Sequence, residues 1–421
     1  MQVTLRPAPI HGFLAAPPSK SMASRAILCS ALSGGECRID HLDLSNDILV
    51  LLAAARQLGC LLDLEPDAVT ISAPAQLGCP VHAIHCGESA TALRFLIPIL
   101  ALGGQRVRFI GKERLLQRPM QIYADLLPQH GCTFTQTVDG ITISGKLTGG
   151  DFTLPGNVSS QFISGLLFAL PLLSCASTIR VQPPFASRSY VELTRSMQAL
   201  FGVVSFWQGE NTLFIPGGQQ YRPQDYVVEG DYGLSAYPAL LGTVFGPVTI
   251  AGLRADSLQG DTALLRILQR CGGSFTAHAD RVRFTQGNLH GGEIDLADCP
   301  DLGPLCMVMA ALASGTTVLR HTDRLRLKES DRIAAMQQEL EKFGVNVAVF
   351  PDAVTITGGP IQAPEELLDS HHDHRIAMSL AALALAAEVP VRIDNAEAVR
   401  KSWPTFWNDL SRLGACVTVH A

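Results

Sequence analysis

A chain of 421 residues is too long for one ordinary hydrophobic core, so its length favours two domains. Hydrophobic residues make up 47% of the chain and charged residues 17%, a composition that excludes a disordered protein. The formal net charge of −6 argues against a general nucleic-acid surface, so clustered Lys and Arg are expected to serve a small anion.

The chain begins with MQVTLRPAPI, in which apolar and polar residues alternate as in a strand. This start has neither the charged beginning nor the apolar centre of a signal peptide. The longest apolar stretches, 165–173 and 380–387, are far shorter than the roughly 20 residues of a membrane-spanning helix. The 11 cysteines include no CxxC pair and are expected to be reduced, with most of them in the core. We therefore predict a soluble, cytoplasmic protein that does not enter a membrane.

A helix-like stretch that ends in glycine and leads into a strand-like segment recurs six times. The six glycines are Gly59, Gly131, Gly202, Gly272, Gly344 and Gly414. Neighbours in this set lie 70 to 72 residues apart, a spacing too regular for chance. Each glycine is expected to cap a helix in the left-handed conformation, which glycine adopts without steric cost. The repeat counts against a Rossmann fold or a TIM barrel, and its period is too long for the common solenoids.

The fifth repeat shows the internal pattern most clearly. Its predicted elements are a strand at 293–296, an apolar helix at 302–313, a strand at 316–320, an amphipathic helix at 331–343 and a hairpin at 345–350 and 354–357. The order is β-α-β-α-β-β. Helices that are apolar all round, at 165–173, 304–313 and 376–387, must be buried among other elements. Three such units with helices inside and sheets outside would make one domain, and six would make two.

Hydroxyl and basic residues gather where the first helices are expected to begin. Pro17-Pro18-Ser19-Lys20-Ser21 is followed by Arg25, and Gly156-Asn157-Val158-Ser159-Ser160-Gln161-Phe162 opens a buried helix. Free backbone N–H groups, hydroxyls and cations at a helix start favour an anion site. The plain alternative is a capped helix with solvated charges. Two further segments have the same character, 86–91 before the helix that carries Arg94, and 114–119 with Arg118.

A charge run, Arg324-Leu325-Arg326-Leu327-Lys328-Glu329-Ser330-Asp331-Arg332, crosses the start of the second helix of the fifth repeat. Ser330 or Asp331 is expected to cap that helix, and the mixture of Lys, Glu and Arg suits acid–base chemistry beside a phosphate. Upstream, Asp298 and Asp301 flank a proline before the buried helix, where one of them could act simply as its cap.

Asp369-Ser370-His371-His372-Asp373-His374-Arg375 leads into the apolar helix of the sixth repeat, and Arg400-Lys401 follows later. His and Asp are good metal ligands, so a metal site is the alternative interpretation of this cluster. Because Arg375 inside the cluster would repel a cation, we predict no metal here.

Four motifs spread from residue 17 to residue 379 resemble the EPSP synthase family: PPSKSMASRA, GNVSSQF, RLRLKESDRI and HDHRIAMS. KESDR and DHR together are far more specific than a glycine-rich loop. The resemblance implies a two-domain inside-out α/β barrel of six β-α-β-α-β-β repeats, three in each domain. It places residues 1–18 and 229–421 in one domain and 19–228 in the other, with helix N-termini facing the cleft between them.

The resemblance implies that the enolpyruvyl group of phosphoenolpyruvate moves to the 5-hydroxyl of shikimate 3-phosphate, with release of phosphate. Lys20, Asp301 and Glu329 are the implied catalytic residues. Asp301 would accept the hydroxyl proton, and Glu329 would transfer a proton at the methylene carbon. The implied ligands of shikimate 3-phosphate are Lys20, Ser21, Arg25, Ser159, Ser160, Gln161, Ser187, Tyr190, Asp301 and Lys328. The implied ligands of phosphoenolpyruvate are Lys20, Ala90, Arg118, Gln161, Glu329, Arg332, Arg375 and Lys401.

Each substrate carries a carboxylate and a phosphate, so about six negative charges must be balanced together. Converging Lys, Arg and helix dipoles are suited to this task. The resemblance implies no metal and no organic cofactor. It implies a monomer whose partners are the two small-molecule substrates, with no nucleic acid and no membrane.

Three positions depart from the usual family pattern. Glu88-Ser89-Ala90-Thr91 stands where Asn-Ala-Gly-Thr is common, and the Ala90 methyl predicts weaker inhibition by glyphosate. Arg324 stands where a neutral or acidic shikimate contact is usual. The segment Gly230-Asp231-Tyr232-Gly233-Leu234-Ser235-Ala236 replaces Gly-Asp-x-Ser-Ser-Ala.

Three other functions remain alternatives. A UDP-N-acetylglucosamine enolpyruvyl transferase shares the fold and the donor, but KESDR and HDHR together are not expected in it. An RNA 3′-phosphate cyclase, built from similar units, would need a nucleotide and a catalytic histidine. A non-catalytic anion-binding protein with this fold would not need the full set of Lys20, Asp301, Lys328, Glu329, Arg332, Arg375 and Lys401.

Overall fold

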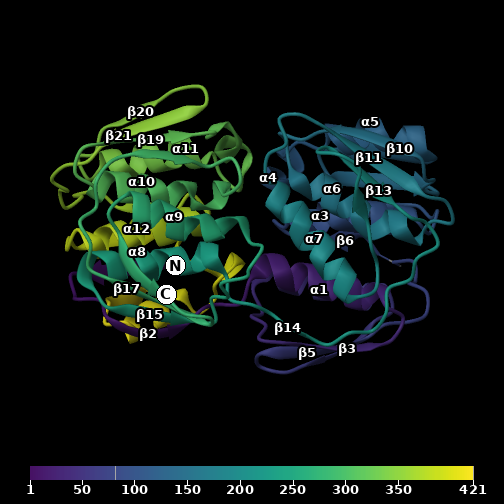
Figure 1. The fold of residues 1–421 in the computed structure, drawn as a ribbon, viewed down its shortest axis with the longest axis horizontal. Helices are drawn as coiled ribbons and strands as arrows, with labels where there is room; N and C mark the ends of the chain where they lie inside the picture. The colour runs from purple at the N-terminus through teal and green to yellow at the C-terminus, as the bar shows by residue number, and fades with distance from the viewer. Residues whose placement is uncertain (81, 421) are drawn as a thin grey trace. The chain divides into compact units, whose positions relative to one another are not determined.

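The computed structural model describes residues 1–80 and 82–420. The chain forms two compact units, unit 1 with Met1–Ser19 and Glu229–Ala421, and unit 2 with Lys20–Val228 (Figure 1). Each unit has a hydrophobic core of its own. The N-terminal segment therefore belongs to the same unit as the C-terminal half of the chain.

The described residues form six four-stranded sheets, three in each unit, with one topology. In each sheet the first two strands are parallel, and the last two continue the sheet in antiparallel fashion. This is the β-α-β-α-β-β pattern that the sequence predicts, so the sixfold repeat is confirmed.

The sheets of unit 2 belong to the first three repeats. Their strands, in spatial order, are β14 (Tyr226–Val227), β3 (Glu36–Asp40), β5 (Ala68–Ser72) and β4 (Leu61–Leu64); β6 (Ile84–His85), β7 (Val107–Ile110), β9 (Gly140–Gly145) and β8 (Cys132–Thr137); and β10 (Asp151–Pro155), β11 (Ser177–Gln182), β13 (Thr212–Ile215) and β12 (Phe206–Trp207). The strand β14 follows the third repeat in sequence, but it pairs with β3 of the first repeat. The chain therefore returns to the first sheet of this unit after it has completed the third.

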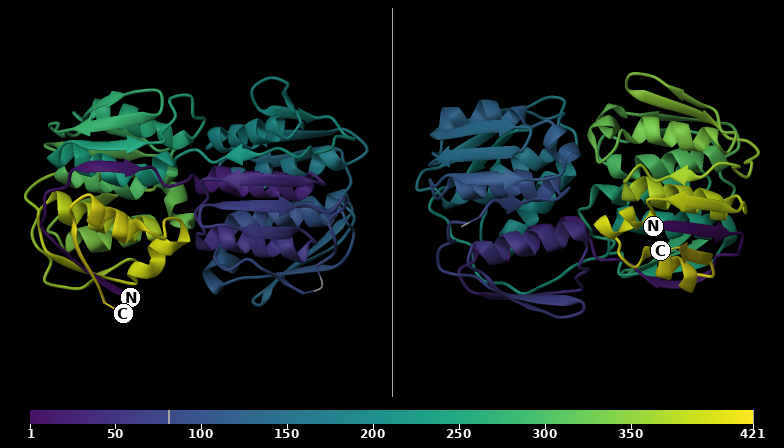
Figure 2. Two further views of the ribbon diagram at one scale, coloured as in Figure 1. Left: turned by 90° about the horizontal axis from the view of Figure 1, so that it is seen from below. Right: turned by 180° about the vertical axis from the view of Figure 1, so that it is seen from behind.

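The sheets of unit 1 belong to the last three repeats. Their strands are β2 (Gly12–Ala15), β15 (Val248–Ala251), β17 (Arg281–Thr285) and β16 (Ser274–Ala277); β18 (Glu293–Asp295), β19 (Thr316–Arg320), β21 (Ala353–Thr357) and β20 (Val347–Val349); and β22 (Leu368–Asp369), β23 (Val391–Asp394), β1 (Gln2–Arg6) and β24 (Cys416–His420). The expected N-terminal strand is β1, which pairs with β24, so the two ends of the chain lie side by side (Figure 2).

The first helix of every repeat is buried, as the apolar sequences of the third, fifth and sixth repeats predict. These helices are α1 (Lys20–Leu32), α3 (Ala90–Ala101) and α6 (Ser160–Ala169) in unit 2, and α8 (Tyr232–Phe245), α10 (Gly303–Leu312) and α12 (His374–Ala386) in unit 1. Within unit 2, α3 packs on α6, and within unit 1, α12 packs on both α8 and α10 (Figure 1). Helices therefore occupy the inside of each unit.

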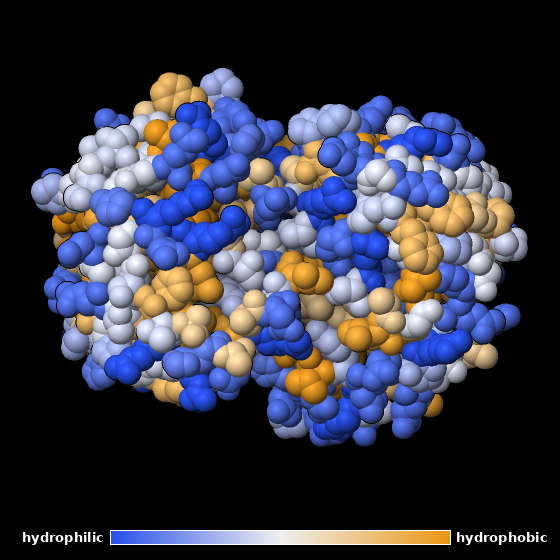
Figure 3. Space-filling view, viewed as in Figure 1, coloured by the Kyte–Doolittle hydropathy of each residue, from blue (hydrophilic) through white to orange (hydrophobic). Residues whose placement is uncertain are grey.

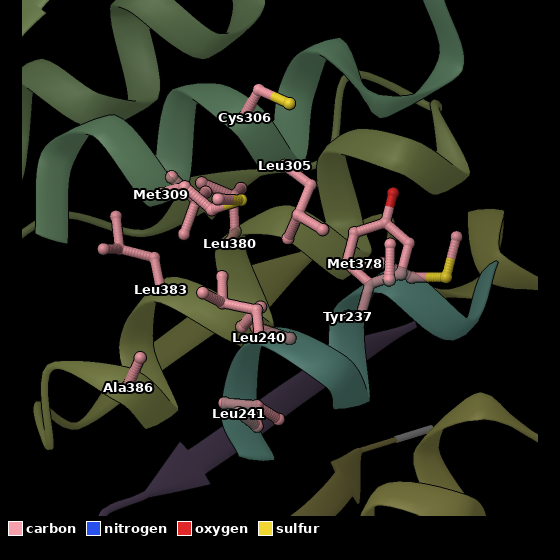
Figure 4. Close-up of a cluster of buried hydrophobic side chains, with 14 of the residues drawn as sticks. Tyr237, Leu240, Leu241, Leu305, Cys306, Met309, Met378, Leu380, Leu383 and Ala386 are labelled. Atoms are coloured by element: carbon pink, nitrogen blue, oxygen red, sulfur yellow. The ribbon is translucent and has the colours of Figure 1, made fainter. Parts of the chain in front are cut away.

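Side chains from the three helices of unit 1 interlock in its core (Figure 4). Leu240 comes from α8, Leu305 and Met309 from α10, and Leu380 and Leu383 from α12, and all five are at most 2% exposed. Fully burying one such side chain contributes roughly 1.5–3 kcal/mol. This packing holds the three helices against one another, and hence also the polar residues that precede them.

The remaining α-helices are the second helices of the repeats and short connecting helices. They are α2 (Asn46–Gln57), α4 (Glu113–Gln117), α5 (Gln121–Leu126), α7 (Arg188–Leu200), α9 (Ala263–Arg270), α11 (Arg332–Glu341) and α13 (Phe406–Arg412). All six landmark glycines adopt the left-handed conformation, with φ between 79° and 108°. The predicted helix caps are thus confirmed, and a side chain at these positions would be strained.

One predicted helix begins and ends earlier than expected. The apolar run 165–173 is not one α-helix, because α6 ends at Ala169 and Leu170–Leu172 form a 3₁₀ turn. Pro171 lies in that turn, and its ring and missing N–H do not allow the α-helix to continue.

The surface carries no broad apolar band on the face shown in Figure 3, where hydrophobic residues stand in small groups among hydrophilic ones. Within residues 1–80 and 82–420, none of the α-helices combines the length and the hydropathy that a membrane span requires.

Candidate active site

Lys20 begins α1 and forms an ion pair with Asp47 of α2. Its Nζ donates a hydrogen bond to Asp47 Oδ2 at 2.8 Å. Asp47 lies in the first turn of α2 and is 7% exposed at its side chain, while that of Lys20 is 21% exposed. The carboxylate therefore holds the ammonium group in one place while leaving part of it accessible.

Arg25, one turn further along α1, is held from three sides. Its Nε donates to Thr194 Oγ1 at 2.9 Å, and its two terminal nitrogens donate to the carbonyls of Ser21 and Tyr190. Burial lowers the pKa of this guanidinium to about 10. Arg25 thus remains a cation at neutral pH, and its orientation is fixed by α1 and α7.

The start of α6 forms a second polar group in unit 2. Ser159 caps the helix by accepting a hydrogen bond from the Gln161 N–H, as expected for the SSQF motif. Arg94 of α3 donates from one terminal nitrogen to Gln161 Oε1 at 2.9 Å and to Ser159 Oγ at 3.2 Å. Gln161 in turn donates to Thr91 Oγ1 at 2.9 Å. The motif is therefore held by α3, not only by its own helix.

The remaining predicted residues of unit 2 stand at helix ends. Ala90 is the first residue of α3, Arg118 follows α4, and Ser187 precedes α7 with a positive φ of 55°. Glu88 is paired with Lys112, whose Nζ lies 2.6 Å from Glu88 Oε1. Its charge beside Ala90 is therefore partly neutralised.

Unit 1 contains a denser set of charges, which we call the unit 1 cluster: Asp301, Lys328, Glu329, Arg332, Asp373, Arg375 and Lys401. Asp301 lies in a 3₁₀ turn, Pro300–Leu302, just before α10. Its Oδ1 accepts hydrogen bonds from Lys328 Nζ at 3.0 Å and from an Arg332 terminal nitrogen at 2.9 Å. The predicted Asp301 and the KESDR motif are thus brought together.

Arg332 is the hub of the unit 1 cluster. Besides Asp301, it contacts Glu329 Oε2 at 3.0 Å and Asp373 Oδ2 at 2.8 Å. The Arg332 side chain is 2% exposed and that of Asp373 is fully buried. Three carboxylates around one guanidinium fix its plane and leave little freedom to any of the four groups.

Arg375 and Lys401 complete the unit 1 cluster. Arg375, in the first turn of α12, donates to the carbonyl of Gly233 at 2.7 Å. Lys401 closes a 3₁₀ turn, Ala396–Lys401, is 3% exposed, and places its Nζ 3.9 Å from Glu329 Oε1. Arg324, which departs from the usual family pattern, donates to the carbonyl of Ala297 at 3.2 Å.

The charges of the unit 1 cluster set the protonation of Asp301 and Lys328. Burial by itself raises the pKa of Asp301, but Lys328, Arg332 and Arg375 outweigh it and hold the pKa well below its ordinary value. Burial lowers the pKa of Lys328, and Arg332 and Arg324 lower it further against the opposing effect of Asp301. Asp301 is therefore an ionised carboxylate, and the proton on Lys328 is more easily lost than usual.

The acidic and hydroxyl side chains that could have capped α10 and α1 do not do so. The helix α10 has Leu302 at its N-cap, so neither Asp298 nor Asp301 caps it. Ser19 precedes α1, but its buried Oγ finds no hydrogen-bond partner among the described residues. Asp331 does cap α11, and Asp373 caps α12.

Two histidines of the sixth repeat lie beside carboxylates. His371 Nε2 lies 3.1 Å from Glu339 Oε1, and His374 Nδ1 lies 3.5 Å from Asp373 Oδ1. In the part of the chain that the structure describes, no three His, Cys, Asp or Glu side chains are arranged to hold a metal ion.

Sequence reasoning assigned no role to Asp47, Arg94 or Asp261. Arg94 carried a usable signal, because it is the one charged residue of the apolar segment 90–101. A buried cation in such a helix must be paired or functional. Asp47 and Asp261 each stand among other polar residues near the start of a second helix, and no sequence pattern distinguishes them.

The two sets of residues can perform different parts of one kind of chemistry. Unit 2 presents Lys20 and Arg25 with hydroxyls and a helix N-terminus, which suits a phosphorylated polyol. Unit 1 presents two carboxylates, Asp301 and Glu329, on one guanidinium, with two lysines next to them. That arrangement suits proton transfer beside an anion.

Comparisons with known proteins agree with this chemistry. The family described as EPSP synthase (3-phosphoshikimate 1-carboxyvinyltransferase) matches residues 5–410. The chain is 37% identical over 419 residues to the 3-phosphoshikimate 1-carboxyvinyltransferase of Clostridium kluyveri, which covers 98% of this chain and 97% of that protein. It is 37% identical over 422 residues to the protein of the same name from Clostridioides difficile, covering 97% and 96%.

Two solved structures are similar over nearly the whole chain. An EPSP synthase from Acinetobacter baumannii has a TM-score of 0.84 at 26% identity, covering 99% of this chain and 100% of that one. The enolpyruvyl transferase NikO from Streptomyces tendae has a TM-score of 0.79 at 18% identity, covering 99% and 98%, and supports the fold alone.

Proposed function

The chain belongs to the EPSP synthase (3-phosphoshikimate 1-carboxyvinyltransferase) family, and from this premise we propose how its residues move an enolpyruvyl group from phosphoenolpyruvate to the 5-hydroxyl of shikimate 3-phosphate. This activity belongs to the shikimate pathway of aromatic amino-acid biosynthesis, and both substrates are small molecules. The proposal concerns which side chains carry out each step.

The main support for the proposal is that Arg332 forms ion pairs with both Asp301 and Glu329. Arg332 contacts Asp301 at 2.9 Å and Glu329 at 3.0 Å, and Lys328 contacts Asp301 at 3.0 Å. An addition–elimination reaction needs one group to take the hydroxyl proton and another to give a proton to the methylene carbon. Two fixed carboxyl groups on one cation can divide these tasks.

We assign Asp301 as the base that accepts the proton of the attacking hydroxyl. Glu329 exchanges a proton with the methylene carbon, so that C2 becomes electrophilic and the hydroxyl adds to it. Loss of phosphate from the resulting ketal, with removal of a methyl proton, regenerates the enol ether. Lys20 assists these proton transfers and contacts both substrates.

The cations divide between the two substrates. We assign shikimate 3-phosphate to residues at the starts of α1, α6 and α7 and to the fifth repeat: Lys20, Ser21, Arg25, Ser159, Ser160, Gln161, Ser187, Tyr190, Asp301 and Lys328. We assign phosphoenolpyruvate to Lys20, Ala90, Arg118, Gln161, Glu329, Arg332, Arg375 and Lys401. Fixed cations of this kind also stabilise a departing phosphate.

We further propose that the two compact units are the two domains of the enzyme, and that it works as a monomer in the cytoplasm. Separate hydrophobic cores in units 1 and 2 support the domain assignment. Sedimentation velocity at micromolar concentration tests the monomer, and a concentration-dependent dimer would contradict it.

Phosphate release from phosphoenolpyruvate tests the proposed reaction. We expect phosphate release with shikimate 3-phosphate and none with UDP-N-acetylglucosamine. The reverse result would show that the protein is a UDP-N-acetylglucosamine enolpyruvyl transferase. Lys328→Met is expected to abolish most of the release, whereas Lys146→Met, at an exposed position, should retain it. Equal activity of the two variants would show that Lys328 does not take part in the reaction.

A further inference from the structure

Asp261 is a buried carboxylate that the mechanism above does not use. It lies in the 3₁₀ turn Gly260–Thr262 before α9 and is 5% exposed. Among the described residues, none forms a hydrogen bond with its Oδ1. A buried polar atom without a partner costs roughly 1–3 kcal/mol, and more when it is charged. Such an atom therefore calls for a functional explanation.

Gly233 allows this carboxylate to approach Arg375. A Cβ placed on Gly233 would clash with Asp261 Oδ2 and would lie 3.1 Å from each terminal nitrogen of Arg375. The carboxylate and the guanidinium thus lie against the same side of Gly233, near the start of α8. Arg375 nevertheless donates to the Gly233 carbonyl, and the described part of the chain shows no hydrogen bond between Arg375 and Asp261.

The neighbours of Asp261 are unusually charged for a buried site. Its surroundings include carboxylates, cations and thiols from several elements: Asp301 before α10, Asp231 before α8, Arg375 on α12, Lys328 after the turn Asp323–Leu327, and Cys299 and Cys306 around the start of α10. Lys328 and Arg332 both donate to Asp301, so Asp301 takes the hydrogen bonds and Asp261 is left without them. Burial, with Asp301 and Asp231 nearby, raises the pKa of Asp261 to about 7.

We propose that Asp261 is a positioning residue that takes up one proton when an anionic substrate binds at Arg375. This inference rests on the proposed function, in which phosphoenolpyruvate is the anion at Arg375. An ionised Asp261 would repel that anion in a site with little water, and the repulsion would be strong. A proton on the unpartnered Oδ1 removes the repulsion and leaves the full charge of Arg375 to the substrate.

The proton comes from solvent and returns to it when the substrate leaves, so no co-reactant is consumed. Protonation of Asp261 is then part of the binding equilibrium. Where Asp261 is ionised in the free protein, at pH above about 7, binding must include the cost of protonating it. The apparent affinity for phosphoenolpyruvate should then weaken by up to tenfold for each pH unit.

The first measurement compares the KM for phosphoenolpyruvate in the wild type and in Asp261→Asn between pH 6 and pH 9. Asparagine has the shape of the protonated carboxyl group but does not titrate. We expect the ratio of wild-type KM to variant KM to rise steeply above pH 7. Asp256→Asn, at an exposed position in the same loop, should follow the wild type. A ratio that stays flat from pH 6 to pH 9 overturns the proposal.

A second measurement needs no substrate. A carboxyl group whose pKa is raised in the folded protein stabilises it fully below the unfolded pKa of about 3.9, and this contribution is lost as pH rises through about 7. Asp261→Asn should therefore gain in Tm relative to the wild type as pH increases from 5 to 8. A constant difference sinks the inference even if the enzyme is fully active. A rising difference without catalysis would instead contradict the proposed function.

If Asp261→Asn folds poorly, infrared difference spectra of the wild type provide a test that needs no variant. Adding phosphoenolpyruvate should produce one new protonated-carboxyl band near pH 7.5. No new band means that no carboxyl group gains a proton, and the proposal fails.

Discussion

Arg332 Nε lies 2.8 Å from Asp373 Oδ2, and the two side chains are 2% and 0% exposed. This pair joins the KESDR motif at the start of α11 to the DHR motif at the start of α12. Ser330 also donates to Asp373 Oδ2, at 3.0 Å. The two most distinctive motifs of the sequence are therefore parts of one buried network.

Replacement of Asp373 should destabilise the protein strongly. Asp373→Ala leaves Arg332 buried beside two remaining carboxylates and removes the cap of α12. Breaking a buried pair by deleting one partner costs about 3–5 kcal/mol. Urea unfolding measures the loss. Asp280→Ala, which removes an exposed pair with Arg281, is the control and should change little. Equal effects of both variants would show that the buried pair is not special.

The fold could be predicted from the sequence because each element of the repeat is determined by residues that are close together in the chain. A glycine cap, an apolar helix and a hairpin recur at a fixed period, and each follows from neighbouring residues. The predicted helix at 165–173 extends beyond the end of α6, because the prediction followed the apolar run and not the position of Pro171. The strand β1 of the sixth sheet was expected as a strand, but its pairing with β23 joins segments nearly 400 residues apart and follows from no local pattern.

The site could be predicted only where a motif carried it. Lys328, Glu329 and Arg332 stand together in the sequence, and the structure brings Asp301 to them. Asp47 was not predicted as a site residue, because its role depends on its contact with Lys20, which is 27 residues away in the sequence. Such pairs depend on how two helices pack, which single residues do not encode.

Asp301 is expected to be essential for turnover. Asp301→Asn keeps the shape of the side chain but cannot accept the hydroxyl proton, so kcat should fall by about 10²–10⁴-fold. Steady-state kinetics measure this loss, and an unchanged Tm shows that the variant is folded. Asp298→Asn, three residues away and exposed, is the matched control and should remain active. Because the pKa of Asp301 is held well below its ordinary value, we also expect no acidic loss of wild-type activity from this group between pH 5 and pH 7.

Asp47 is expected to position Lys20. Asp47→Asn replaces a charged acceptor at 2.8 Å by a neutral one, so the ammonium group loses its fixed place. A hydrogen bond to a charged group contributes about 1.5–3 kcal/mol, and kcat/KM should fall by about tenfold or more. Asp47→Glu should recover part of the loss. Asp63→Asn on the exposed strand β4 should have no effect, and a loss of similar size there would argue against a specific role.

His371 should make stability depend on pH. Its hydrogen bond with the buried Glu339 raises the pKa of His371, so its stabilising charge is fully present below the unfolded pKa of about 6.5 and is lost as pH rises through the folded pKa. His371 has a φ of 51°, which asparagine tolerates. The Tm advantage of wild type over His371→Asn should therefore be larger at pH 5.5 than at pH 9. A difference that stays flat between these two pH values would contradict the expectation.

Ala90 is expected to weaken inhibition by glyphosate. It is the first residue of α3 and is 5% exposed, so its methyl group occupies space at the start of a buried helix. If the inhibitor must fit against this methyl group, the crowding costs about 1–3 kcal/mol, and Ala90→Gly should lower the inhibition constant by about tenfold. Glu88 contributes less to this effect than its charge alone predicts, because Lys112 pairs with it at 2.6 Å. Inhibition against phosphoenolpyruvate measures the change, while the KM for shikimate 3-phosphate should stay constant. An unchanged inhibition constant in a folded Ala90→Gly variant would place the methyl group away from the inhibitor.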